Sequence, residues 1–130
     1  MEMFKKCLKI AVLAHKWQKR KDGRPYITHP IRVSKSFSDE RLKCIAILHD
    51  VLEDADSEYI LPIIPSEILK PLKLLTKNEW ITYENYIFAL IGSWDRDAIE
   101  VKIADIMDNL SDNPSDKQIE KYSWALEQLL

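Results

Sequence analysis

Ile47-Leu48-His49-Asp50-Val51-Leu52-Glu53-Asp54 places one imidazole and three carboxylates directly after an apolar run that begins at Cys44. On a helix, positions 49, 50, 53 and 54 share one face, because offsets of three and four residues return to the same side. Carboxylates at the C-terminal end of a helix oppose its dipole, and a neighbouring buried segment strengthens their mutual repulsion. A bound cation would relieve this repulsion, so the pattern predicts a metal site with spare carboxylates beside it.

Apolar residues at helical spacing surround this stretch, and no alternating strand-like pattern of convincing length appears. Ser38 or Asp39 is a suitable N-cap for the central helix, and Gly92 a suitable stop for a later one. Prolines break the pattern between residues 57 and 71. We predict helices at 3–19, from Thr28 or His29, at 40–53, 66–75, 82–91, 95–110 and 116–130. The fold class is therefore all-α, with one compact helical domain over residues 1–130.

Composition narrows the choice of function. The chain has 130 residues, of which 46% are hydrophobic and 31% charged, as expected for one globular domain. The net charge of −2 gives no support for a nucleic acid or an anionic membrane as a partner. No apolar run approaches the ~20 residues that cross a bilayer, and the N-terminal apolar stretch is too short for a signal peptide. We expect a cytoplasmic protein; its oligomeric state is not indicated by the sequence.

Several polar residues have ordinary explanations when each is taken alone. His29 precedes Pro30 and could be a surface or capping histidine. Asp105 shares helical spacing with Lys102 and Asn109, which is also the pattern of a solvated helix face. The cysteines Cys7 and Cys44 lie in apolar segments without CxxC spacing, so we expect two reduced core thiols.

Other candidates have similar alternatives. Arg20 and Lys21 could form an ordinary charged turn, and Glu53 and Asp54 could extend into solvent at a helix end. The combination favours a site instead, because two imidazoles and two carboxylates suit Mn²⁺, Fe²⁺ or Zn²⁺ better than Ca²⁺ or Mg²⁺. Such an ion would activate a water molecule and stabilise charge on a phosphate. The candidate ligands are His29, His49, Asp50 and Asp105.

Four stretches of the chain resemble the HD superfamily of metal-dependent phosphohydrolases, whose signature is a His, then a His-Asp pair, then a distant Asp. The stretches are AHKWQKRKDGRPYITHP at 14–30, LHDVLED at 48–54, LTK at 75–77 and VKIADIMDNL at 101–110. Within that superfamily, the chain most resembles the (p)ppGpp hydrolase domain of RelA/SpoT proteins and the small stand-alone alarmone hydrolases. The likeness covers residues 8–112.

This resemblance implies a helical HD-domain bundle that removes the 3′-pyrophosphate of (p)ppGpp. The four candidate ligands would bind the metal, typically Mn²⁺. Glu53 and Asp54 would be the catalytic carboxylates that orient the attacking water and move protons. Arg20 and Lys21 would hold the nucleotide, and Asn109 would contact its sugar-phosphate end.

The chain also departs from the family at positions near the expected substrate. Ile106 stands where the family usually has Arg, Ser111 and Asp112 where alarmone hydrolases commonly have Arg and Thr, and Asp22 where many members have Ser. The metal and catalytic residues are complete, whereas the nucleotide-recognition residues are fewer. The alternatives are an HD phosphohydrolase for another nucleotide or phosphoester, and a non-catalytic metal- or nucleotide-binding module.

Overall fold

The computed structural model describes residues 2–53 and 57–130, and over these residues it contains helices without a strand. An isolated bridge pairs Lys19 with Pro25 in the loop between the first two helices. The elements are α1 (Glu2–His15), α2 (Thr28–Ser34), α3 (Glu40–Leu48), η1 (Val51–Glu53), α4 (Ser57–Ile60), η2 (Leu61–Ile63), α5 (Ser66–Leu75), α6 (Tyr83–Gly92), α7 (Arg96–Ser111) and α8 (Asp116–Leu129). The predicted all-α class is confirmed.

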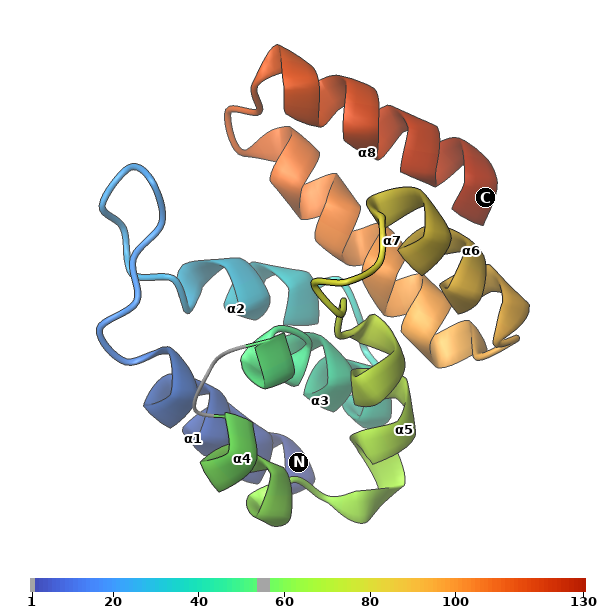
Figure 1. Cartoon of the computed structure of the whole chain (residues 1–130). Helices are drawn as coiled ribbons and strands as arrows, with labels where there is room; N and C mark the ends of the chain where they lie inside the picture. The colour runs from blue at the N-terminus through green and yellow to red at the C-terminus, as the bar shows by residue number, and fades with distance from the viewer. Residues whose placement is uncertain (1, 54–56) are drawn as a thin grey trace.

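Helix α3 is the centre of the bundle. It packs against α1, α2, α5 and α7, and α8 lies along α7 at the far side (Figure 1). Residues 44–48 are completely buried, as expected for a helix that is apolar on all sides. A smaller cluster joins α6, α7 and α8 around Ile87 and Ile106. The packing of α2, α3 and α7 on one another brings polar residues from distant parts of the chain to one place.

Capping residues set the helix starts much as the sequence predicts. The Asp39 side chain accepts a hydrogen bond from the backbone N–H of Leu42 at 3.0 Å, and Thr82 caps α6 through the N–H of Asn85. Each cap satisfies an N–H that has no partner within its helix. The predicted cap at Asp39 and the predicted start at Thr82 are confirmed.

The central helix ends earlier than predicted. The expected helix at 40–53 stops at Leu48, and Val51–Glu53 form a separate 3₁₀ turn. The backbone N–H of His49 and its side-chain Nδ1 both lie within hydrogen-bonding distance of the carbonyl of Ala46, three residues back, so the α-helical spacing is lost there. The shared helical face predicted for positions 49, 50, 53 and 54 is therefore wrong for the described residues, and Asp54 lies outside them.

The first helix is also shorter than predicted. It ends at His15 instead of residue 19, and Trp17 follows with a φ of 75°. This left-handed conformation cannot continue an α-helix. Residues 16–27 then form an extended loop in which Gly23, with a φ of 89°, makes the tight turn (Figure 1). This loop places Arg20 and Lys21 in the lining of the pocket described below.

The sequence prediction for the two cysteines is confirmed. Cys7 and Cys44 are completely buried free thiols, as predicted. Among residues 2–53 and 57–130, no helix has the length and apolar character needed to cross a membrane.

Candidate metal centre and its pocket

Three side chains from three helical segments converge on one point inside the bundle. His29 comes from the first turn of α2, His49 directly follows α3, and Asp105 lies in the middle of α7. Their exposed fractions are only 2%, 3% and 5%, respectively. Asp105 Oδ1 lies 2.8 Å from His29 Nε2 and 3.2 Å from His49 Nε2, and one ligand atom from each residue lies within 4.8 Å of the other two. Asp105 therefore does not lie on a solvated helix face, and His29 is not a surface histidine.

Asp50 lies at the edge of this group. Its Oδ2 atom is 3.1 Å from His49 Nε2 and 4.0 Å from His29 Nε2. The Tyr26 hydroxyl donates a hydrogen bond to the same oxygen. The structure thus brings all four candidate ligands together, and Tyr26 holds Asp50 in its orientation.

The hydrogen bonds of the two imidazoles indicate which nitrogen of each ring is available. His29 Nδ1 lies 2.6 Å from Asp108 Oδ2, and His49 Nδ1 lies 2.6 Å from the Ala46 carbonyl oxygen. Both partners are acceptors, so each Nδ1 carries the proton. In the neutral rings, both Nε2 lone pairs then face the same oxygen, Oδ1 of Asp105. Only a positive charge between these groups, a proton or a metal ion, makes that arrangement favourable.

The pKa shifts show the same demand for positive charge. Burial alone would favour a neutral His49, but the carboxylates of Asp50 and Asp105 raise its pKa well above the usual value. Burial alone would raise the pKa of Asp50, but the neighbouring His49 outweighs this effect and lowers the pKa of Asp50 to about 2. Lys102, with its Nζ 2.9 Å from Asp105 Oδ2, and His49 lower the pKa of Asp105 despite its burial. The donor set and its charges fit a divalent transition ion.

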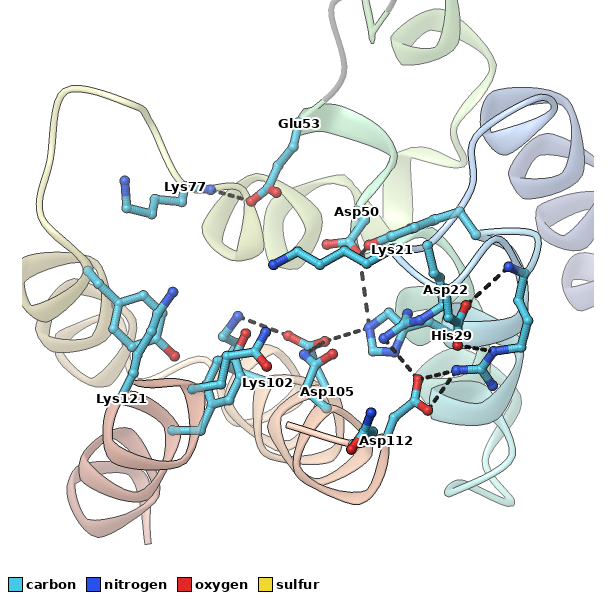
Figure 2. Close-up of a pocket in the computed structure, with 18 of the residues that line it drawn as sticks. Lys21, Asp22, His29, Asp50, Glu53, Lys77, Lys102, Asp105, Asp112 and Lys121 are labelled. Carbon is cyan, nitrogen blue, oxygen red and sulfur yellow. Dashed lines mark hydrogen bonds and ion pairs between the residues drawn. The ribbon is translucent and has the colours of Figure 1, made fainter. Parts of the chain in front are cut away.

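Glu53 lies across the pocket from these groups. Its Oε1 accepts a hydrogen bond from the backbone N–H of Lys77 at 2.9 Å, and Figure 2 shows the side chain pointing into the same space as Asp50. The surrounding protein disfavours the charged carboxylate and raises the pKa of Glu53. The second predicted catalytic carboxylate, Asp54, is outside the described residues.

A cavity of about 670 Å³ opens from the centre toward solvent and is lined by Arg20, Lys21 and Asn109, the predicted nucleotide-binding residues. Arg20 is held by the protein itself, because its Nη2 lies 3.2 Å from Asp112 Oδ2. Asn109 Nδ2 donates to Asp105 Oδ1 at 3.3 Å. A volume of this size is typical of pockets for small molecules.

Four residues that support the centre were not predicted from the sequence: Tyr26, Arg32, Lys102 and Asp108. Asp108 and Lys102 each lie three residues from Asp105 on α7, so helical spacing placed them on the same face. The contact of Tyr26 with Asp50 joins segments 24 residues apart and has no local signal. Arg32 completes the support, because its guanidinium donates two hydrogen bonds to Asp108 at 2.9 and 3.0 Å.

We expect Asp108→Asn to weaken divalent-metal binding by about 10- to 100-fold, the usual effect of removing a carboxylate that orients a ligating histidine. The substitution removes the negative charge that fixes the Nδ1 proton of His29, while His29 itself remains. Isothermal titration calorimetry measures the change. Asp97→Asn is the matched control, because Asp97 is an ion-paired carboxylate at the other end of α7. Equal affinities for the two variants would contradict the orienting role.

Most of the chain matches the model of a known family. The model of the HD domain family matches residues 3–113. The chain belongs to the HD domain family. This HD domain is 32% identical over 121 residues to a guanosine-3′,5′-bis(diphosphate) 3′-pyrophosphohydrolase of Aquifex aeolicus, covering 84% of this chain and 17% of the relative. It is 41% identical over 64 residues to the pyrophosphohydrolase MESH1 of Drosophila melanogaster, covering 43% of this chain and 36% of the relative.

The HD domain thus spans well under half the length of these two relatives. A solved structure of a metazoan ortholog of SpoT, described as hydrolysing ppGpp, superposes with a TM-score of 0.80 at 24% identity. That match covers 99% of this HD domain and 86% of the solved chain. It establishes the shared fold over nearly the whole chain.

Proposed function

We propose that this HD domain is a metal-dependent phosphohydrolase that removes the 3′-pyrophosphate of (p)ppGpp. The observation that carries the proposal is the buried convergence of His29, His49 and Asp105 at the base of an open pocket. The names of the relatives from Aquifex aeolicus and Drosophila melanogaster support the choice of substrate. The proposed partner is therefore a small nucleotide, and the proposed location is the cytoplasm.

The proposed roles follow from what each group can do. The four candidate ligands hold the metal, for which we propose Mn²⁺ as the native ion. When bound, a divalent ion supplies Lewis-acid chemistry, which activates water and stabilises charge on a phosphate. The metal ligands are His29, His49, Asp50 and Asp105.

Glu53 is the proposed proton acceptor for the attacking water. Its Oε1 is engaged by Lys77, which leaves Oε2 for the proton. A raised pKa makes the carboxylate a better base, since the driving force for proton uptake grows with pKa. Asp54 is the proposed second catalytic carboxylate. Arg20 and Lys21 are proposed to hold the nucleotide, and Asn109 its sugar-phosphate end.

A second candidate is hydrolysis of another nucleotide or phosphoester by the same groups. It is favoured by the ion pairs of Asp112, whose carboxylate engages Arg20 and Arg24. These pairs reduce the positive charge that the loop can offer to a phosphate. The two candidates share the metal centre and differ only in what the pocket admits.

A substrate panel separates the two candidates. Purified protein with Mn²⁺ is assayed against ppGpp, dGTP, a deoxynucleoside monophosphate, a cyclic nucleotide and NADPH, with products separated by ion-exchange chromatography. We expect the highest kcat/KM for ppGpp, with GDP and pyrophosphate as products. A higher kcat/KM for another member of the panel would replace ppGpp as the proposed substrate, and no turnover of any member would favour the binding-module alternative.

A further inference from the structure

The cations that line the pocket differ in their partners. On the side of the α1–α2 loop, the arginines are paired with carboxylates. Arg24 Nη2 lies 2.7 Å from Asp112 Oδ1 and its Nε lies 2.6 Å from Asp22 Oδ2, while Arg20 Nη2 lies 3.2 Å from Asp112. An anionic ligand on this side must compete with carboxylates that already hold these guanidinium groups.

Lys19 and Lys21 line the pocket from the α1–α2 loop, and the other lysines of the lining lie on the opposite side. In Figure 2, Lys77, Lys102 and Lys121 lie on one side, away from Asp22 and Asp112. They come from the loop after α5, from α7 and from α8. Lys102 Nζ and Lys121 Nζ lie 6.0 Å and 4.3 Å from the centre of the same Tyr83 ring. Two positive charges, one from α7 and one from α8, thus lie beside one aromatic ring.

Two of these three lysines form no ion pair with the described residues. Lys102 is paired with Asp105, but over residues 2–53 and 57–130 no carboxylate lies within ion-pair distance of Lys77 or Lys121. The Nζ of Lys77 donates to the carbonyl oxygen of Asn78 at 3.2 Å. Burial, followed by repulsion from Lys102 and Lys77, lowers the pKa of Lys121. Like charges held together in this way are stabilised when an anion binds between them.

We propose that Lys77 and Lys121 form a subsite for the phosphate group that the enzyme leaves intact. The inference rests on the proposed function and adds that the site selects nucleotides with a second phosphate group. Lys102 contacts both Asp105 and the Tyr83 ring that Lys121 also contacts, so it lies between the metal centre and Lys121. A nucleotide with phosphates at both 3′ and 5′ positions can occupy both places at once. A nucleotide without the second phosphate leaves the lysine subsite empty.

Three guanosine nucleotides test this directly: each carries the same 3′-diphosphate, with a 5′-diphosphate, a 5′-monophosphate or a 5′-hydroxyl. We expect the kcat/KM of the wild type to fall as 5′ phosphates are removed. Lys121→Ala is expected to lose about 10- to 100-fold in kcat/KM on the 5′-diphosphate, the scale of one charge-assisted contact. On the 5′-hydroxyl nucleotide the variant should match the wild type, because the contact is absent there.

Two further variants exclude other causes. Lys121→Arg keeps the charge and is expected to recover most of the loss. Lys117→Ala removes an exposed lysine of the same helix that does not line the pocket, and should leave all three rates unchanged. The subsite alone would be overturned if Lys121→Ala lowered kcat/KM equally on all three nucleotides. It would also be overturned if the kcat/KM of the wild type did not depend on the 5′ phosphates. Hydrolysis of none of the three would overturn the proposed function together with it.

Discussion

Asp105→Asn is expected to lose nearly all divalent-metal binding and more than about 100-fold in turnover, since even a residue that only orients a metal ligand costs 10- to 100-fold. Asp105 Oδ1 lies within 3.2 Å of the Nε2 atoms of both imidazoles, and the two oxygens of Asp105 also accept from Lys102 and Asn109. The amide would direct an N–H or a neutral oxygen at His29 and His49. Neither replaces the charge that attracts a cation.

The measurement is the metal content of the purified variant, by mass spectrometry, together with its rate on ppGpp. Asp97→Asn, the same change near the start of the same helix, is expected to keep both. Asp105→Ala and His49→Ala extend the test, because each removes a proposed ligand completely. Stoichiometric metal in both of these variants would show that the assignment of the ligands is wrong.

Glu53→Gln is expected to keep the metal and to lose at least about 100-fold in kcat, the lower range for removal of a positioned general base. Glu53 lies outside the group of residues around Asp105, and its Oε1 contacts the backbone of Lys77. A glutamine keeps that acceptor and loses the ability to take up a proton. Loss of the metal in this variant would make Glu53 a ligand, and an unchanged kcat would exclude it as the base.

The pH dependence of kcat gives an independent test of Glu53. The surrounding protein removes part of the solvation of its carboxylate and so raises its pKa, and only the ionised form accepts a proton. The kcat should therefore be highest at pH values above that raised pKa and should fall as the pH drops through it. This fall should occur at a higher pH than the pKa of about 4.3 of a free glutamate. The profile is measured at saturating metal, because protonation of the histidines also releases the ion at low pH. The residual activity of Glu53→Gln should lack this acidic limb.

Much of the fold was predictable because the relevant signals are local. The apolar residues 44–48 indicated a central helix, and Asp39 and Thr82 marked helix starts through the donors that follow them. The helix ends were harder to predict. His49 bonds the Ala46 carbonyl through its side chain, and Trp17 takes a left-handed conformation without a glycine. Neither event leaves a pattern in hydrophobic spacing.

The candidate site was predictable to a similar extent. The candidate ligands were found because their residue types and order are specific, and the fold brings them together. The charge balance around the pocket was not predicted, because it depends on contacts between distant segments. Arg24 meets Asp112 across 88 residues, and Lys121 reaches Tyr83 from another helix. These contacts determine which cations are free for a substrate.

The most direct test of the proposed function follows ppGpp and its products before and after Mn²⁺ is added to metal-free protein. The expected result is no reaction without the ion, and then GDP and pyrophosphate in equal amounts once it is present, with the reaction stopped by a chelator. GDP formation at the same rate without metal, or no GDP with it, would contradict metal-dependent 3′-pyrophosphate hydrolysis by this HD domain.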